Sequence, residues 1–297
     1  MDRFGSGLNW VLRALLVVFL LLLLADCQAP EIKRELIALA DSSDLLEKEE
    51  IDLEFDHPGG EVGLAIVNRQ TLLTTFLFYH SLSLLGHAAG YYYQQMETGS
   101  PWIQKGSRRI YELLGGIEVG YRDERGTWKW IASINEQGPI AEDHTLIRLP
   151  ASNAKRIQLK LRTTKGLWRI NSLQLVSIVQ PVHPIRLSPV GVTKNQLEDT
   201  VALHRLVAAS DHLVTYPGED YRIRYELPAA KAADFFIETE GYYIEWMRDE
   251  WLPEENLTQA KTLFLYPREY LKSIAHVYKA REPEMEHVFW NSRYTKR

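Results

Sequence analysis

Apolar residues recur at every second position in short runs between residues 117 and 179, and this alternation limits the fold more than any other feature of the chain. The clearest run is IQLKLR over residues 157–162, and Gly126, Gly138-Pro139 and Lys165-Gly166 supply turn signals between runs. A period of two with one apolar face predicts antiparallel strands with that face buried. Several such strands in succession predict a β-sandwich or jelly roll.

The same alternation predicts where two tryptophans point. Trp128 and Trp130 share a parity with Ala132 and Ile134. A regular strand would place all four on the buried face. At first glance the two tryptophans look like a platform for sugars, but their spacing leads us to expect both indoles in the core instead.

Composition and patterning divide the 297 residues into four expected parts. Residues 1–27 read as a signal peptide or membrane anchor, residues 28–56 as a tether, residues 57–180 as the β-sandwich domain and residues 181–297 as a C-terminal α+β lobe. The expected fold class is mainly β. Residues 61–115 fit helix and strand patterns about equally, so both alternatives stay open for that stretch.

The N-terminus has the pattern of an export signal. Arg3 and Arg13 precede an apolar run over residues 14–25, as in the charged and hydrophobic regions of a signal peptide. Leu24-Ala25-Asp26-Cys27 resembles the lipobox of bacterial lipoproteins, in which the cysteine is lipidated; Asp26 departs from the usual Gly, Ala or Ser. An uncleaved anchor over residues 10–25 and a plain cleaved signal are the alternatives.

All three interpretations of the N-terminus send the rest of the chain out of the cytoplasm. We expect a bacterial cell-envelope protein that is anchored to a membrane through its N-terminus, with lipidation at Cys27, and that faces the periplasm or the exterior.

Charge and motifs exclude several classes. A net charge of −5, without a basic block, argues against a nucleic-acid partner. One cysteine excludes an intramolecular disulfide framework and a cysteine-rich metal site. We find no nucleophile elbow, phosphate loop, dinucleotide fingerprint or His-Glu-x-x-His motif, and His80 and His87 lack zinc spacing. No catalytic residue is assigned, and neither a cofactor nor a metal is expected.

Some segments resemble known families. Gly126-x-Trp128, the Gly138-Pro139 break, the IQLKLR strand and the edge Gly166-Leu-Trp168-Arg-Ile170 are similar to the galactose-binding-like jelly roll of discoidin-type and carbohydrate-binding modules. The resemblance implies ligand loops at one end of a sandwich, without transferring any binding residue. The segments 240–248 and 284–294 resemble uncharacterised bacterial envelope proteins.

One candidate ligand surface lies near residue 241. Parity changes after Gly241, and a β-bulge there would place Glu238, Glu240, Tyr243 and Glu245 on one face, near Arg248. A turn at Gly241 is the alternative. Carboxylates, a guanidinium and an aromatic ring could bind sugar hydroxyls. A solvated sheet face covered by the C-terminal helix is the plainer interpretation.

Two classes of function follow. The first is a non-catalytic, membrane-tethered envelope protein whose β-sandwich binds a glycan or a protein partner. The second is a polysaccharide hydrolase that uses carboxylates of the C-terminal lobe, such as Glu238 with Glu240 or Asp249 with Glu250. The missing motifs and the need for two carboxylates across a cleft favour the first.

Overall fold

The computed structural model divides the chain into two compact units, which are described separately. The first unit holds the described residues up to Val179 and those from residue 247 onward, and the second holds those between Gln180 and Gly241. The structure describes residues 36–135, 138–139, 142–180, 182–208, 211–227, 235–239, 241 and 247–291. Cys27 and the expected signal segment lie outside the described residues.

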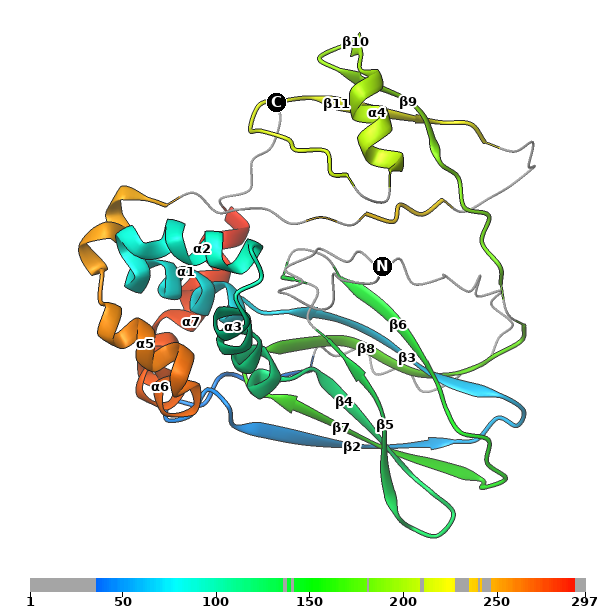
Figure 1. The fold of residues 1–297 in the computed structure, drawn as a ribbon. Coiled ribbons are helices and arrows are strands. Elements are labelled where there is room, and N and C mark those ends of the chain that lie inside the picture. Colours follow the sequence, from blue (N-terminus) through cyan, green and yellow to red (C-terminus); the bar gives the residue numbers. More distant parts are fainter. Residues whose placement is uncertain are drawn as a thin grey trace. The chain divides into compact units, whose positions relative to one another are not determined.

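The first unit contains two four-stranded antiparallel sheets (Figure 1). One sheet has the order β1-β8-β3-β6. Its strands are β1 (Leu36–Ile37), β8 (Trp168–Ser177), β3 (Val62–Gln70) and β6 (Asp143–Arg148). In β3 the residues at even positions are buried, as a strand with one face toward a core requires.

The second sheet has the order β2-β7-β4-β5. Its strands are β2 (Lys48–Asp56), β7 (Arg156–Thr164), β4 (Ile117–Arg122) and β5 (Trp128–Ile134). The inner face carries the apolar residues of the IQLKLR run, and the outer face carries its polar ones. The expected antiparallel strands are therefore present.

Both sheets contribute to one hydrophobic core. Leu64 and Leu173 of the first sheet, and Val119 and Leu159 of the second, are fully buried in the same cluster. Burial of such side chains stabilises each by roughly 1.5–3 kcal/mol relative to exposure. The core explains why the strands keep their register, because a slip by one residue would expose the apolar face.

Helices follow β3 directly and resolve the stretch that had two interpretations. They are α1 (Leu73–Leu85), η1 (Gly86–Ala88), α2 (Ala89–Glu97) and α3 (Pro101–Leu114). Leu73, Phe76, Leu77 and Leu84 are buried at the spacing of one helix face. Residues 62–70 are thus strand and residues 73–85 helix. The fold class "mainly β" is too narrow, since the helices of this unit hold more residues than its strands.

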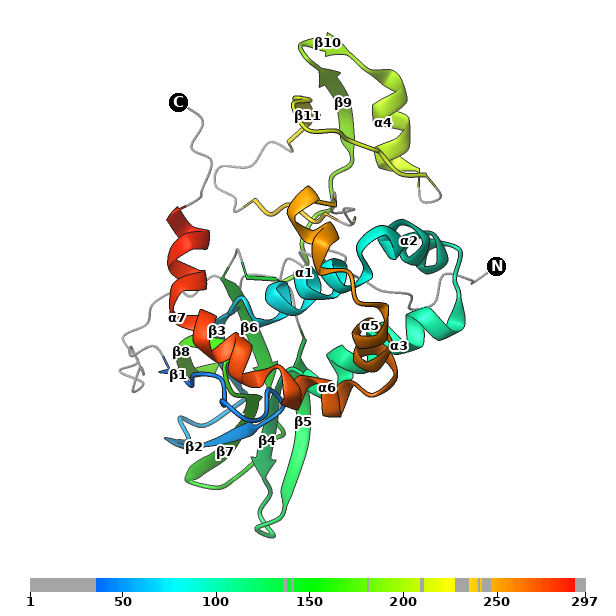
Figure 2. The ribbon, with the colours of Figure 1, turned by 90° about the vertical axis from the view of Figure 1, so that its left-hand side faces the viewer.

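The C-terminal helices belong to the same unit. They are η2 (Asp249–Glu254), α5 (Leu257–Leu265), α6 (Pro267–Ser273) and α7 (Ala275–Asn291). Asn256 caps α5 by accepting the backbone N–H of Gln259 at 3.0 Å. Leu263, Leu271 and Tyr278 are buried in the common core. Figure 2 shows these helices beside α1.

One carboxylate ties the last helix to the first sheet. Glu286 on α7 lies 2.9 Å from Arg169 on β8 and 3.3 Å from Arg69 on β3. The two arginines are paired across neighbouring strands. Without a shared acid, their like charges would repel one another.

This division differs from the expected domain boundaries in two places. Residues 48–56, expected in the tether, form β2 at the edge of a sheet. The expected lobe 181–297 is not one unit, because the described residues from 247 onward pack with the first unit. The sequence did not predict that the chain from residue 247 onward packs with the first unit, because no local pattern shows which core a helix will join.

The second unit is small. β10 (Leu197–Glu198), β9 (Pro189–Lys194) and β11 (Tyr221–Tyr225) form an antiparallel sheet in that order, with α4 (Thr200–Val207) packed on β9. Asp199 caps α4 by accepting the N–H of Ala202 at 2.8 Å. Residues 211–227 contribute the strand β11 to this sheet, where it pairs with β9.

Within the described part of the chain, no helix combines the length and the apolar character that crossing a bilayer would require.

Candidate functional site

A β-bulge in β5 turns two tryptophans away from the core. Val119 of β4 pairs with Ala132, but the next residue, Gly120, pairs with Trp130. Ile131 is therefore the extra residue, and side chains before it change face. Ala132 and Ile134 stay on the inner face, whereas Trp130 and Trp128, which pair with Gly120 and Arg122, lie on the outer face.

The expectation that both indoles are buried is therefore wrong. Trp128 is 37% exposed and Trp130 is 44% exposed, whereas Ile134 on the same strand is buried. Their rings lie on one face of β5, which is an edge strand of its sheet. An unbroken strand would have buried both rings, but the extra residue Ile131 breaks the period of two.

The missing side chain of Gly120 leaves space in which the Trp130 ring packs closely on the backbone of β4. A Cβ atom added to Gly120 would lie 3.3 Å from both Cε3 and Cζ3 of Trp130 and 3.6 Å from Cβ of Lys160. The indole of Trp130 therefore lies across the backbone of β4, toward β7. A glycine inside a strand commonly marks such a close approach.

Two cations of β7 hold the rings. The guanidinium carbon of Arg162 lies 4.2 Å from the ring centroid of Trp130, and Nζ of Lys160 lies 5.2 Å from that of Trp128. Both distances fall within the range of cation–π interactions. We call Trp128, Trp130, Lys160, Arg162 and Glu118 the tryptophan platform.

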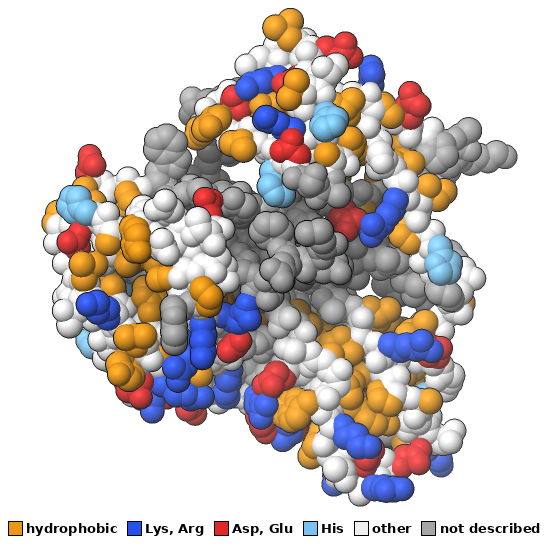
Figure 3. All heavy atoms as spheres, viewed as in Figure 1, with side chains coloured by type: hydrophobic (Ala, Val, Ile, Leu, Met, Phe, Trp, Pro, Cys, Tyr) orange, Lys and Arg blue, Asp and Glu red, His pale blue; other side chains and the backbone are white. Residues whose placement is uncertain are grey.

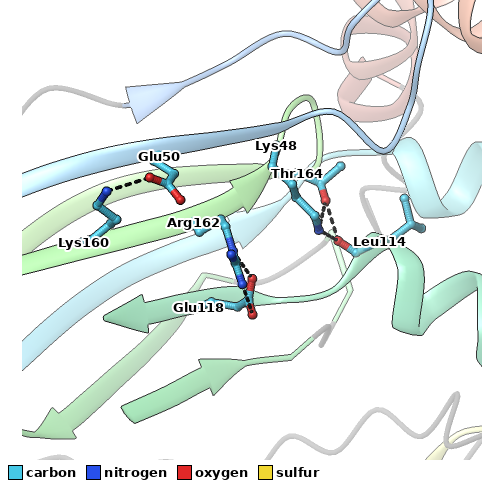
Figure 4. A network of polar contacts seen from close by, with 7 residues as sticks. All are labelled: Lys48, Glu50, Leu114, Glu118, Lys160, Arg162 and Thr164. Carbon is cyan, nitrogen blue, oxygen red and sulfur yellow. Dashed lines mark hydrogen bonds and ion pairs between the residues drawn. The ribbon is translucent and has the colours of Figure 1, made fainter. Parts of the chain in front are cut away.

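Carboxylates on the neighbouring strands fix these cations (Figure 4). Arg162 donates two hydrogen bonds to Glu118, at 2.7 and 2.9 Å. Lys160 donates to Glu50 at 2.7 Å and lies 3.6 Å from Asp52. The fork between Arg162 and Glu118 is the stronger restraint, because two parallel bonds fix orientation as well as distance.

The pKa values of these groups shift as the pairing requires. Hydrogen bonds from Arg162 are the main cause that lowers the pKa of Glu118. The hydrogen bond to Glu50 is the main cause that raises the pKa of Lys160. Both groups therefore stay charged around neutral pH, and the platform presents paired charges of opposite sign.

Lys48 anchors the adjoining end of the sheet to α3. Its Nζ donates to the carbonyl oxygen of Leu114 and to Oγ1 of Thr164, each at 2.6 Å. Burial is the main cause that lowers the pKa of Lys48. The contact satisfies a carbonyl at the C-terminal end of α3, where a cation is favoured. The start of β2 is thereby joined to the end of α3.

The tryptophan platform offers several kinds of group that can contact a ligand. Partly exposed indole rings offer apolar faces, and the ordered carboxylates and cations beside them offer acceptors and donors. On the face drawn in Figure 3, basic and acidic side chains of the described residues lie among apolar ones. Within the described residues, no group of three or more His, Cys, Asp or Glu side chains could hold a metal ion.

The face expected around Gly241 is not brought together by the described residues. Glu238 lies in the second unit and pairs with Arg186 at 3.4 Å. Arg248 lies in the first unit, where its guanidinium carbon is 4.9 Å from the ring of Trp251 and 5.5 Å from that of Tyr79. Glu240, Tyr243 and Glu245 lie outside the described residues.

The structure describes three of the four carboxylates considered for hydrolysis, and Glu240 lies outside the described residues. Glu238 belongs to the second unit, whereas Asp249 and Glu250 are exposed in η2 of the first. The two histidines have separate partners. His80 bonds Tyr270, and His87 bonds Glu255 through both its backbone N–H and its ring.

Sequence reasoning missed Gly120, Glu118, Lys160 and Arg162 as parts of a site. A signal for Gly120 was present, because it interrupts an otherwise well-formed strand between Val119 and Tyr121. The charged residues carried no such signal, since alternating charges are normal on any solvated strand face.

Comparisons with known proteins add little. No protein-family model matches the chain, and no curated protein matches it. Among solved structures, the chain is similar to TmCBM61 in complex with beta-1,4-galactotriose, with 12% identity and a TM-score of 0.24. The match covers 44% of this chain and 63% of that one. A TM-score this low carries no further argument.

Proposed function

We propose that the protein binds a glycan on the tryptophan platform. The observation that carries the proposal is the bulge at Ile131, which places Trp128 and Trp130 on the outer face of an edge strand. Exposure of two large indoles side by side gives up the stabilisation that their burial in the core would provide. Pyranose rings present flat patches of C–H groups that stack on such rings, while their hydroxyls need donors and acceptors.

Charge supports an uncharged glycan. The cations of the platform are already paired, Arg162 with Glu118 and Lys160 with Glu50 and Asp52. An acidic sugar would have to displace a carboxylate from Arg162, at the cost of a bidentate interaction. A neutral sugar can accept from the cations and donate to the carboxylates without separating them.

The test is retention of glycans by the full-length protein. We expect wild type to retain neutral oligosaccharides on a glycan array, and the double variant Trp128→Ala/Trp130→Ala to lose them. Tyr91→Ala removes an exposed aromatic ring on α2 and serves as the matched control. If wild type retains no glycan, or the double variant binds as well as wild type, the proposal is wrong.

The same proposal places the platform outside the cytoplasm on a membrane tether at Cys27, as the export signal indicates. Metabolic labelling with a palmitate analogue tests the tether. We expect wild type to be labelled and Cys27→Ser to lose the label. If Cys27→Ser leaves the labelling and the size of the protein unchanged, the tether is not a lipid on Cys27 and the uncleaved anchor becomes the better interpretation. A non-catalytic role is supported by the missing catalytic motifs in the sequence.

A further inference from the structure

A pocket between the helices of the first unit lies apart from the tryptophan platform. It has a volume of about 390 Å³ and is lined by His80, Gln259, Thr262, Tyr270, Ser273, Ile274 and Val277. These residues come from α1, α5, α6 and α7 and the turn before α7, so the pocket exists only once the C-terminal helices pack beside α1. Its volume is in the usual range for small-ligand pockets.

No lining side chain carries a charge at neutral pH. Burial is the main cause that lowers the pKa of His80, and burial raises the pKa of Tyr270 to about 12. Both rings are therefore neutral, as are the hydroxyl, amide and aliphatic side chains around them. A charged ligand would lose its hydration without gaining a partner of opposite charge.

The polar groups form an ordered chain. Nε2 of His80 lies 2.8 Å from the hydroxyl of Tyr270, and that hydroxyl lies 3.5 Å from Oε1 of Gln259. If the Tyr270 hydroxyl donates to Gln259, His80 is the donor to Tyr270, which assigns the proton to Nε2. The ring of His80 is held in place by stacking on Phe76, with 5.6 Å between centroids.

The two aliphatic hydroxyls already have their protons committed. Thr262 donates to the carbonyl oxygen of Thr258 at 3.0 Å, and Ser273 donates to that of Tyr270 at 2.7 Å. Each hydroxyl oxygen can therefore act toward the pocket only as an acceptor. A complementary ligand must supply O–H or N–H donors and must also pack an apolar surface on Ile274 and Val277.

We propose that this pocket binds a small uncharged polyol of about the size of one sugar ring. The acceptors select a ligand with several hydroxyl donors, the lack of charge excludes acids and amines, and Ile274 with Val277 covers the C–H face of the ring. The inference does not rest on the tryptophan platform. The ligand is a free polyol or the terminal unit of a chain, since both present the same chemistry.

The experiment follows the side-chain nitrogen signals of His80 by NMR in full-length, ¹⁵N-histidine-labelled protein. The probes are D-glucose, D-galactose, D-mannose and myo-inositol, with D-glucuronate and D-glucosamine as charged analogues. We expect at least one uncharged probe to shift the His80 signal saturably, and the charged analogues to bind at least ten-fold more weakly. A trisaccharide that ends in the same sugar distinguishes the two sources of the ligand. If the site binds the end of a chain, the trisaccharide should bind as well as the free sugar; if it binds a free polyol, only the free sugar should bind.

Two variants test whether the shift arises from a ligand inside this pocket. Val277→Phe fills the pocket, and Gln259→Ala removes a polar group at an exposed position where folding is not at risk. Both should lose the shift, whereas Lys261→Ala, exposed on the same helix, and Trp128→Ala/Trp130→Ala should keep it. No saturable shift with any uncharged probe, equal binding of the charged analogues, or a shift that survives Gln259→Ala overturns the proposal.

Discussion

The guanidinium carbon of Arg162 lies 4.2 Å from the ring centroid of Trp130, on the outer face of the sheet formed by β2, β7, β4 and β5. Glu118 holds the same guanidinium through two hydrogen bonds. Position and orientation of the indole thus depend on groups from two other strands. This preorganisation is what distinguishes the tryptophan platform from a pair of loosely exposed rings.

Removing a platform tryptophan is expected to cost little stability. Trp128→Ala should lower the free energy of unfolding by about 1 kcal/mol or less, because the ring is exposed and its Lys160 contact is weak. Trp168→Ala is the matched control, since Trp168 is buried and should cost about 3–5 kcal/mol. Urea denaturation of both variants measures the difference. Equal losses would show that Trp128 is a core residue after all.

The sequence was a sound guide to strands and a poor guide to faces. IQLKLR over residues 157–162 forms β7 with the predicted face buried, because nothing interrupts its period. The period of β5 breaks at Ile131, a residue type that gives no warning of a bulge. One extra residue was enough to move Trp128 and Trp130 from the core to the candidate site.

The helical part was harder to predict for a different reason. Leu73, Phe76 and Leu77 have helical spacing, yet the Thr- and aromatic-rich run around them also suits a strand. Packing against the C-terminal helices decides the outcome. Asn256 and Pro267 mark helix starts that sequence can reveal. That these helices pack in the first unit depends on long-range contacts, which the sequence does not reveal.

Gly120→Val should displace the Trp130 ring. The first added carbon would lie 3.3 Å from two ring atoms, and the valine methyl groups would extend into the space that the ring occupies. We expect glycan binding to weaken at least ten-fold while the fold persists, because β-branched residues suit strands. Gly90→Val, where nothing lies within 4 Å, is the control for a change of the same size. Undiminished glycan binding by Gly120→Val would show that binding does not depend on the position of the Trp130 ring over residue 120.

Arg162→Lys should weaken glycan binding with only a small change in stability. Lysine keeps the positive charge but cannot make the two parallel bonds to Glu118 or stack a planar group on Trp130. We expect roughly three- to ten-fold weaker binding, which corresponds to about 0.7–1.4 kcal/mol. Calorimetric titration measures the affinity. Arg148→Lys, which affects an exposed ion pair with Glu61 on the other sheet, should bind as wild type does. If the two variants behave alike, Arg162 acts only through its charge.

The stability of the protein should depend on Asp143 in the direction opposite to most carboxylates. Burial is the main cause that raises the pKa of Asp143 to about 6, well above the ordinary value of an aspartate. The folded state therefore binds more protons than the unfolded state between about pH 4 and pH 6, and the free energy of unfolding falls as the pH rises through this window. Asp143→Asn removes the buried charge. We expect it to raise the free energy of unfolding by about 1–2 kcal/mol at pH 7, a value discounted because solvent screens part of the effect. Below pH 4 we expect no change, because the carboxyl group is then protonated in both the folded and the unfolded state.

Asp123→Asn provides a control of opposite sign for this experiment. The hydrogen bond from Lys129 is the main cause that lowers the pKa of Asp123 below its usual value. Its contribution to stability is present above the unfolded pKa and is lost as the pH falls through the folded one. Denaturant titrations at pH 4 and pH 7 should therefore show Asp143→Asn gaining stability toward neutral pH relative to wild type, and Asp123→Asn losing it. If Asp143→Asn is less stable than wild type at pH 7, the carboxylate makes a favourable interaction that outweighs its burial.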